Sequence, residues 1–554
     1  MSRILQSQFS HLALLATLAA TLLLRGLGNN SLGYPDADRI LMDGVFLRDT
    51  MTDMPFGNPW TYAQAYFAQY PALSIGYRPP FFPFVEGIFN LLFGVNMWSS
   101  RLALFGFVLV GLLCWYKMVR RMTGAPAAVG SAALWLSTPF VAQWGWYTMA
   151  ELAVLSVVLC AIYYLVRWLE DGYPRDAVSL AFAIGIAAWT KQTAAFLVLT
   201  TLLVLVARGR FHWAIRQPTH YGAALLLVAI IVPLGVMTVV FGDQNIHQSL
   251  GDGSGKALSR LSLENWLVHL KTLVRVHLSP PALALVAIGL VISFYYNRKA
   301  LWLPAIVIVS VYIFFSLMVG KNPRYPIFWI PFWMLIAALP LSVWGLNTAR
   351  GRLYAGLVSL VVVFQGVMVF REEPLYATGY DVAAQEAIRV ADDASVFIDA
   401  YHNGYFTYFA RQADKARQSY ILRGDKLLSS SSIVSSHWQE VHAETEDDIL
   451  KIFDDLAVKA VVVESRNYTG LEIHAKLRRL LLDSTRFEHI RSVPIESNRT
   501  MSSAPGTPRF SDITLELYRY KQAHNEITGD IRLRLPVVGK TVVKEAEDKG
   551  EGQD

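Results

Sequence analysis

The sequence predicts an α-helical polytopic membrane protein that ends in a soluble α/β domain, and three observations support this fold class. Hydrophobic residues make up 54% of the 554 residues and charged residues only 17%, against about a quarter in a typical soluble chain. Residues 1–371 hold 26 Lys/Arg and 13 Asp/Glu, a balance of +13, whereas residues 372–554 hold 23 and 30, a balance of −7. Long apolar runs are confined to the first part. These features exclude a uniform soluble globule and a disordered chain.

The membrane part, residues 1–371, is predicted from apolar runs close to the roughly 20 residues that a spanning helix needs. Short loops rich in Lys and Arg follow the second, sixth, eighth and tenth runs, and such loops usually face the cytoplasm. We therefore expect the N-terminus in the cytoplasm and residues 372–554 outside. About eleven spans are expected, at residues 11–25, 98–118, 125–143, 149–168, 176–189, 192–207, 221–241, 280–296, 301–319, 326–345 and 354–371.

A long outer loop, residues 26–97, separates the first two runs. Several prolines interrupt it, so it is not one long helix. Its apolar stretch at 81–93 is too short to span and suits a helix at the membrane interface. The loop also contains five aspartates, namely Asp36, Asp38, Asp43, Asp49 and Asp53.

Residues 372–539 are expected to form an extracytoplasmic α/β domain. Short β-branched runs alternate there with helical patterns, an alternation typical of an α/β layer. The expected strands are 395–399, 460–464 and 514–520, and the expected helices are 382–391, 446–456 and 471–482. The charged residues 540–554 are expected to be a disordered tail.

Acidic residues at a membrane boundary are candidates for function because burying an ionisable group there is costly. Asp36 and Asp38 follow the first run. A carboxylate near an apolar surface has a raised pKa, which suits a general base for a sugar hydroxyl; the alternative is an ordinary acidic turn before a helix. Glu151 opens the fourth run, and it is either a site residue or a first-turn acid favoured by the helix dipole.

Several basic residues fall on the outer side against the orientation rule, Lys321 among them, and three of these are candidates for binding. Arg78 precedes Pro79-Pro80, Lys191 lies between two short runs, and Arg324 is followed by Tyr325. They either anchor helix ends among lipid headgroups or bind an anionic ligand. The planar guanidinium of Arg suits phosphate because it offers paired donors. The shared sidedness of the three favours a lipid-linked phosphate as their ligand.

Taken in order, these motifs resemble those of the integral-membrane glycosyltransferases of the C-type fold, near the protein O-mannosyltransferases and the aminoarabinose transferases that modify lipid A. The resemblance covers about residues 10–370. In that family the acid after the first span acts as catalytic base, which implies Asp36. A Glu usually follows directly, whereas this chain has Ala37, so Asp38 is the alternative. The matching motifs are Asp36-Ala37-Asp38-Arg39, Arg78-Pro79-Pro80, Thr190-Lys191 and Arg324-Tyr325.

The resemblance also implies the remaining roles. Arg78, Arg324 and Tyr325 would bind the lipid phosphate of the donor, with Lys191 as a further contact, and Glu151 would belong to the catalytic site. The implied donor is a polyprenyl-phosphate monosaccharide, and the acceptor is a glycolipid, a polysaccharide or a protein. The implied location is a bacterial inner membrane, with the C-terminal domain in the periplasm.

Two further questions concern cofactor and competing function. A divalent metal ion stays open as a cofactor, because such enzymes differ in this respect and no His cluster demands one. Nucleic acid is not an expected partner, because no basic stripe with interleaved aromatics is present. The alternative function is a transporter or flippase of lipid-linked sugars, which would place charges near mid-membrane and show repeat-related broken helices.

Overall fold

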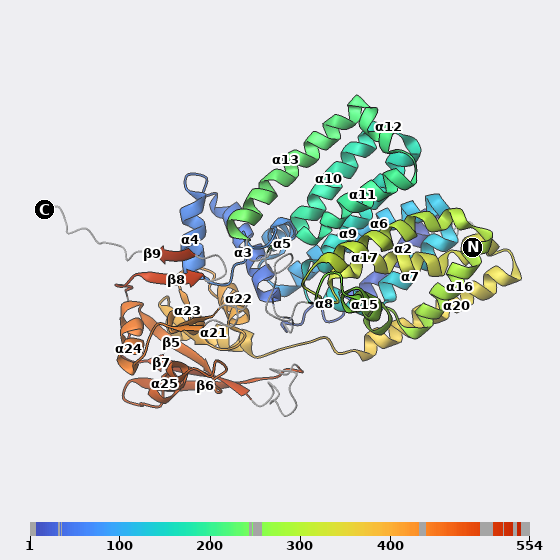
Figure 1. The fold of residues 1–554 in the computed structure, drawn as a ribbon. Coiled ribbons are helices and arrows are strands. Elements are labelled where there is room, and N and C mark those ends of the chain that lie inside the picture. Colours follow the sequence, from blue (N-terminus) through green and yellow to red (C-terminus); the bar gives the residue numbers. More distant parts are fainter. Residues whose placement is uncertain are drawn as a thin grey trace. The chain divides into compact units, whose positions relative to one another are not determined.

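The computed structural model describes residues 7–31, 34, 36–242, 246, 258–431, 439–498, 513–524, 526–535 and 540–544. The chain forms two compact units (Figure 1). The membrane unit comprises Met1–Leu27, Gly76–Val85 and Trp98–Pro374, and the sheet unit comprises Gly28–Ile75, Glu86–Met97 and Leu375–Asp554. The sequence places the first outer loop with the membrane part, whereas in the structure most of this loop belongs to the same unit as the C-terminal domain.

The membrane unit is helical among its described residues. Its elements are α2 (Gln8–Leu23), α6 (Met97–Thr123), α7 (Ala125–Ser137), α8 (Pro139–Trp146), α9 (Ala150–Asp171), α10 (Pro174–Thr190), η1 (Gln192–Ala195), α11 (Phe196–Ala207), α12 (Phe211–Arg216), α13 (Pro218–Phe241), α15 (Leu263–Thr272), η3 (Leu273–His277), α16 (Pro280–Tyr296), η4 (Arg298–Leu301), α17 (Trp302–Leu317), η5 (Tyr325–Trp329), α18 (Ile330–Ala338), α19 (Pro340–Trp344) and α20 (Ala349–Arg371). Helix α5 (Phe81–Phe93) has the bounds expected from its apolar stretch; it begins in this unit and ends in the sheet unit.

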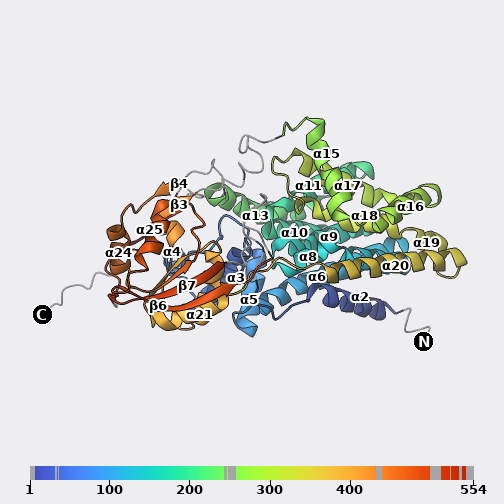
Figure 2. The same cartoon turned by 90° about the horizontal axis from the view of Figure 1, so that it is seen from below.

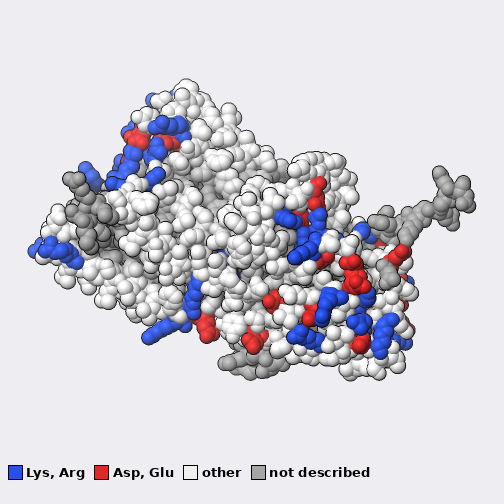
Figure 3. All heavy atoms as spheres, turned by 180° about the vertical axis from the view of Figure 1, so that it is seen from behind, with Lys and Arg blue, Asp and Glu red and all other residues white. Residues whose placement is uncertain are grey.

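Length and hydropathy identify the protein as a multi-pass membrane protein. Among the described residues, six helices are long and apolar enough to cross a membrane, or up to eight if each of two bent pairs is one span. The expected number of eleven is not confirmed, because α2 and the segment Gln192–Ala207 are shorter apolar helices. Large areas of this unit carry no charge on the face drawn in Figure 3. Surface without charge suits contact with lipid, because charged side chains are costly there.

The helices of the membrane unit pack closely where small residues meet. Helices α9, α10 and α13 pack in succession (Figure 1). A Cβ added at Gly289 of α16 would lie only 2.1 Å from the carbonyl oxygen of Ile336 in α18. Glycine thus lets these two backbones approach, as small residues do between membrane helices.

The sheet unit contains the strands and the remaining helices. These elements are α3 (Ala37–Asp53), α4 (Pro59–Gln69), α21 (Tyr380–Ala391), β1 (Ser395–Asp399), α22 (Asn403–Ala413), β2 (Ile421–Arg423), α23 (Gly424–Leu427), β3 (Ser429–Ser431), β4 (Gln439–Val441), α24 (Glu446–Asp455), β5 (Val458–Glu464), α25 (Glu472–Leu480), β6 (Phe487–Ile495), β7 (Ile513–Tyr520), β8 (Ile531–Leu535) and β9 (Lys540–Lys544).

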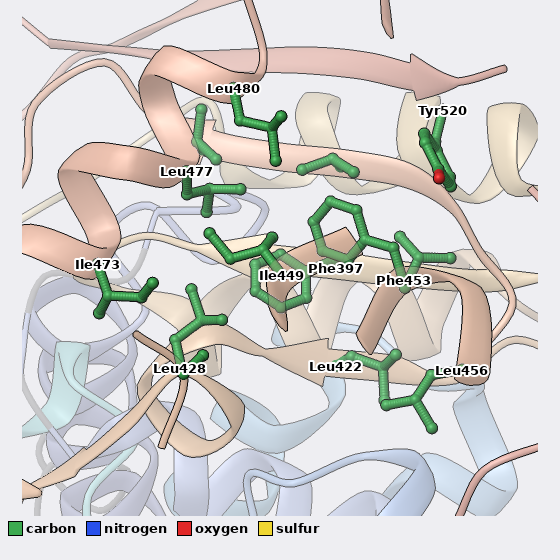
Figure 4. Packing of buried hydrophobic residues seen from close by; sticks show 14 of the residues in the cluster. Phe397, Leu422, Leu428, Ile449, Phe453, Leu456, Ile473, Leu477, Leu480 and Tyr520 are labelled. Carbon is green, nitrogen blue, oxygen red and sulfur yellow. The ribbon is translucent and has the colours of Figure 1, made fainter. Parts of the chain in front are cut away.

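The main sheet has five strands in the order β2-β1-β5-β7-β6. Strand β1 is parallel to β2 and β5, whereas β7 is antiparallel to β5 and β6. Helices α21 and α22 cover one face, and α24 and α25 cover the other (Figures 1 and 2). On the second face Phe397 of β1 packs against Ile449 and Phe453 of α24 and Leu477 of α25 (Figure 4). Alternate strand residues supply the two faces, as the pleat of a strand requires.

The first outer loop contributes to this core. Ala68 of α4 is fully buried in the same cluster as Phe397, and Phe67 packs against its edge. Helix α4 also packs on the hairpin formed by β8 and β9. Residues 540–544, expected in the disordered tail, form strand β9 and pair with β8. Residues 545–554 lie outside the described residues.

Candidate functional site

Glu151 lies in the first turn of α9 and is fully buried. Its Oε1 accepts a hydrogen bond of 2.6 Å from Nζ of Lys191 and lies 3.5 Å from Nε of Arg324. Its Oε2 has no hydrogen-bond partner among the described residues. Glu151 is therefore more than a helix-dipole acid, because two cations converge on its carboxylate.

The two cations reach Glu151 from breaks in the helices. Lys191 has extended backbone angles (φ −162°, ψ 130°) between α10 and η1. Arg324 precedes η5, and its backbone N–H donates to Asn322 Oδ1 at 3.1 Å. The ring of Tyr325 lies beside both cations, 6.0 Å from Lys191 Nζ and 5.8 Å from Arg324 Cζ, distances typical of cation–π contacts.

Arg78 is close enough to Lys191 for the two positive charges to act on each other. The membrane unit thus brings together Glu151, Lys191, Arg324 and Tyr325, with Arg78 within electrostatic range. Two cations, Lys191 and Arg324, converge on one carboxylate, and the exposed fractions of their side chains are 21% and 16%. Such a half-buried excess of positive charge can hold an anion more strongly than the same charges in water.

Lys321 resembles Arg324 in sequence position but has a different role. Its Nζ donates to the carbonyl oxygens of Phe315, Ser316 and Met318 at 3.0, 2.8 and 2.6 Å. These are the orphan carbonyls at the end of α17, so Lys321 caps that helix. Burial lowers the pKa of Lys321 to about 8.

The two candidate bases lie in the sheet unit. Asp36 is the N-cap of α3, but its side chain makes no capping hydrogen bond, and its φ of 82° is left-handed. A non-glycine residue in this region is uncommon, although Asp tolerates it better than most. Asp38 Oδ1 accepts the Arg39 N–H at 2.8 Å. Burial raises the pKa of Asp38 above its ordinary value, and the nearby Asp36 charge acts in the same direction.

Two other aspartates of the loop hold it against the C-terminal domain. Asp49 is fully buried, and its Oδ2 accepts hydrogen bonds of 2.6 Å from Arg411 Nη2 and 2.7 Å from Tyr66. Asp53 binds the guanidinium of Arg417 through both carboxylate oxygens, at 2.5 and 2.9 Å. Sequence reasoning missed Arg411 and Arg417, because no local pattern marks the distant partner of an aspartate.

Asp43 also has a structural role, because it binds Ser74 within the same loop. Its Oδ1 accepts the Ser74 N–H at 2.7 Å, and its Oδ2 accepts the Ser74 hydroxyl at 2.5 Å. Asp36 and Asp38 stay the candidates for chemistry that the sequence suggests. The predicted site residues form two sets, one in each unit. Among the described residues, no group of three or more His, Cys, Asp and Glu side chains could hold a metal ion.

Asp38 also meets a glycine that sequence reasoning missed. Gly404 is the second residue of α22, and a Cβ added there would lie 1.8 Å from Asp38 Oδ2. The carboxylate thus lies against the first turn of α22, where the helix dipole favours negative charge. The pair Asn403-Gly404 reads as a turn in sequence, so only the structure identifies this contact.

Comparisons with known proteins agree with this architecture. Residues 77–236 match the family model described as dolichyl-phosphate-mannose-protein mannosyltransferase. A search of curated protein sequences finds no match. The structure of ArnT from Cupriavidus metallidurans bound to undecaprenyl phosphate is similar, with a TM-score of 0.56 at 14% identity, covering 92% of this chain and 98% of that chain.

Two further structures are similar. The apo state of the same ArnT has a TM-score of 0.57 at 14% identity, with 91% of this chain and 97% of that chain covered. The arabinofuranosyltransferase AftD from Mycobacteria has a TM-score of 0.50 at 12% identity, with 94% of this chain and 40% of that chain covered. These similarities confirm the resemblance that the motifs indicated: the chain has the fold of the C-type integral-membrane glycosyltransferases.

Proposed function

We propose that the protein transfers a monosaccharide from a polyprenyl-phosphate donor to an acceptor hydroxyl at the outer membrane face. The observation that carries this proposal is the convergence of Lys191 and Arg324 on the buried Glu151, with Arg78 within electrostatic range of Lys191. The similar ArnT structure was solved with undecaprenyl phosphate. A lipid phosphate of this kind is the anion that such a cluster suits.

The cluster would favour the transition state over the bound donor. A sugar phosphodiester carries one negative charge, whereas the departing phosphate monoester carries about −1.5 to −2. Arg324, Arg78 and Lys191 therefore gain interaction energy as the bond from the anomeric carbon to the phosphate oxygen breaks. Interactions that strengthen in this way raise the rate of the chemical step. Tyr325 would keep the two nearest cations in place through its ring.

Asp36 would act as the general base, with Asp38 as the alternative. The carboxylate takes the proton of the acceptor hydroxyl while the hydroxyl oxygen bonds to the anomeric carbon. The electron pair of the breaking bond leaves with the lipid phosphate, so one displacement inverts the anomeric centre. The raised pKa of Asp38 supports a base near this turn, because a more basic carboxylate accepts a proton more readily.

We infer a positioning role for Glu151, which the sequence had suggested as a catalytic residue. Glu151 accepts a hydrogen bond from Lys191 and lies close to Arg324. Its negative charge offsets the repulsion between these two cations and so keeps them side by side. The net charge of the cluster stays positive. Glu151 would therefore act on the donor through Lys191 and Arg324 rather than by touching the sugar.

The acceptor is proposed to be a glycolipid, a polysaccharide or a protein, presented outside a bacterial inner membrane with the sheet unit in the periplasm. The carboxylates of Asp36 and Asp38 are the oxygen ligands that Mg²⁺ or Mn²⁺ prefers. Transfer should accordingly be measured with a chelator and with each cation added back, which decides the metal requirement.

The test uses full-length protein in proteoliposomes with radiolabelled polyprenyl-phosphate sugars and extracted envelope acceptors. Release of free polyprenyl phosphate reports transfer. Arg324→Gln is expected to lower the rate by roughly 10²–10³-fold, and Asp36→Asn by roughly 10²–10⁴-fold. Arg350→Gln, an exposed arginine at the start of α20, is the matched control and should keep the wild-type rate.

Two outcomes would contradict parts of the proposal. Full transfer by Asp36→Asn would remove Asp36 as the base, and loss of transfer in Asp38→Asn alone would assign that role to Asp38. Movement of intact lipid-linked sugar across the bilayer, without release of polyprenyl phosphate from any donor, would favour the flippase alternative.

A further inference from the structure

Three buried polar side chains of α15 and η3 bind the backbone that leads to Arg324. Asn265, His269 and His277 each have only 1% of their surface exposed. Each contacts a backbone carbonyl oxygen of residues 315–323. The pairs are Asn265 Nδ2 with Ser316 at 2.8 Å, His269 Nε2 with Phe315 at 3.1 Å and His277 Nε2 with Pro323 at 2.8 Å. Of these three contacts, the one made by His277 is nearest to Arg324 in the chain.

The two hydrogen bonds of His277 determine where its ring carries hydrogen. A carbonyl oxygen only accepts, so Nε2 of His277 donates to Pro323. An indole N–H only donates, and Nε1 of Trp329 lies 2.9 Å from His277 Nδ1, which is therefore the acceptor. Both bonds together require the neutral ring with its hydrogen on Nε2. A protonated imidazole would lose the hydrogen bond from Trp329, because both of its nitrogens are donors.

The two partners of this ring lie on either side of Arg324 and Tyr325 in the chain. Pro323 directly precedes Arg324, whereas Trp329 is the last residue of η5, which Tyr325 begins. Pro326 within η5 has non-helical backbone angles (φ −83°, ψ 21°), so the segment is not a regular helix that holds its own shape. One imidazole thus fixes both ends of the short segment that carries two residues of the candidate site.

The local structure around His277 places the imidazole at this position. His277 ends η3, a π-helical turn in which the Leu278 N–H donates to the carbonyl oxygen of Leu273 at 3.0 Å. Such turns are rare and occur frequently at functional sites. The chain then bends by 117° into α16. On the side of α8, the ring of Phe140 packs against the imidazole with ring centroids 4.5 Å apart. The imidazole is therefore held by ring packing as well as by its two hydrogen bonds.

A small movement of the segment would change what Arg324 can bind. Its Nε lies 3.5 Å from Glu151 Oε1, and its side chain is only 16% exposed. A charged group in such a half-buried place acts strongly on an anion at short range, and its effect falls with distance. Misplacement of a binding group by about 1 Å can lower a rate roughly 10²-fold. Restraint of the backbone beside Arg324 is thus a way to control catalysis.

We propose that His277 is a positioning residue of the donor site. As the neutral ring with hydrogen on Nε2, it holds Pro323 and Trp329 and thereby sets Arg324 for the phosphate of the lipid donor. The hydrogen bonds follow from the structure of the membrane unit. Their effect on catalysis rests on the proposed function.

Substitution of His277 tests this role in the proteoliposome assay. His277→Phe keeps a ring and removes both hydrogen bonds, and it should lower kcat roughly 10–10²-fold. The KM for the polyprenyl-phosphate sugar should change by less than about threefold, because Arg324 gains its interaction as the phosphate departs. His277→Gln, whose amide supplies a donor and an acceptor, should keep kcat within about threefold of the wild type.

His269→Phe is the matched control. His269 is an equally buried histidine of α15 that binds the carbonyl oxygen of Phe315, which Lys321 also binds. Its loss should leave kcat within about twofold of the wild type, because this carbonyl keeps a partner. Equal losses of kcat in His269→Phe and His277→Phe would overturn the proposal, and so would a His277→Gln enzyme as impaired as His277→Phe.

A double-mutant cycle shows whether His277 acts through Arg324. In the Arg324→Gln background, His277→Phe should lower kcat by less than about twofold, because coupled residues are not additive. Full additivity of the two substitutions would overturn the proposal. His277→Asn, whose shorter amide cannot reach both partners, replaces His277→Phe in every comparison if the phenylalanine variant does not fold.

Binding of undecaprenyl phosphate, measured by native mass spectrometry in detergent, separates this role from the proposed function. This lipid carries the phosphate monoester that departs in the reaction, so His277→Phe should weaken its binding about tenfold, and only when Arg324 is present. An enzyme that transfers sugar and tolerates His277→Phe would overturn the positioning role alone. A protein that binds the lipid in this way but transfers no sugar would overturn the proposed function alone. Absence of both binding and transfer would overturn both.

Discussion

The contact between Asp38 and α22 makes Gly404→Ala the sharpest structural test. A Cβ at position 404 would lie 1.8 Å from Oδ2 and 2.7 Å from Cγ of Asp38, whereas ordinary contact begins at 3.4 Å. The carboxylate or the helix must therefore yield by 1.6 Å, the difference between 3.4 and 1.8 Å. Overpacking of this kind costs about 1–3 kcal/mol, which exceeds the gain of up to about 1 kcal/mol that Ala brings to a free helix position.

Hydrogen exchange of the detergent-purified protein, read from peptides of α3 and α22, measures the effect. Gly404→Ala should lower the local opening free energy by about 1–2 kcal/mol, or roughly tenfold faster exchange. Gly366→Ala in α20 is the control, because a Cβ there meets nothing within 4 Å. In an Asp38→Ala background most of the cost of Gly404→Ala should disappear, because only the Cβ of residue 38 stays close, at 3.2 Å. The contact between Asp38 and Gly404 would be refuted if Gly404→Ala were equally destabilising in the Asp38→Ala background. It would also be refuted if Gly404→Ala raised the local opening free energy as Gly366→Ala is expected to do.

Two further predictions concern buried charges of the sheet unit. Arg411→Ala removes the buried cation that pairs with Asp49 and leaves only the more exposed Arg48. It should destabilise the unit by about 3 kcal/mol, the low end for a broken buried pair, seen as faster proteolysis between α3 and α4. Arg389→Ala, which removes an ion pair of an exposed arginine, should change the stability by less than about 1 kcal/mol. Burial raises the pKa of Glu464 from 4.5 to about 7. Its contribution to the free energy of unfolding is therefore full below about pH 4.5 and is lost as pH rises through 7. The free energy of unfolding should fall by about 3 kcal/mol over this range. Denaturant unfolding near pH 5 and pH 8 checks this, and Glu464→Gln should remove the difference.

Several elements of the sheet unit could be predicted from local pattern. The β-branched run at 395–399 forms β1 with the expected bounds, and the pattern at 446–456 forms α24, whose start is fixed by a capping box between Thr445 and Asp448. Helix α22 was missed because it begins with an Asn-Gly pair, which favours a turn in sequence. Strand β6 was missed because Pro494 and mostly exposed residues obscure its alternation.

For the candidate site, the sequence indicates which residues matter but not which of them meet. Glu151, Lys191 and Arg324 stand out in sequence because charges are rare near apolar runs. Their convergence depends on how α9, α10 and η5 pack, which no single run encodes. Lys321 and Arg324 look alike in sequence, but only the structure shows that Lys321 is used to cap the carbonyls of α17.

By itself, the sequence determined the membrane class, a C-terminal region with strands and the residue types that chemistry could use. Hydropathy and charge are properties of short segments, so they can be read without knowing where the chain returns. Only the tertiary structure decided which distant residues these side chains meet. Asp49 meets Arg411, 362 residues away, whereas Asp36 and Asp38 are left on the first turn of α3. An ion pair depends on which distant segment packs beside it, and that choice is made by the burial of many side chains together.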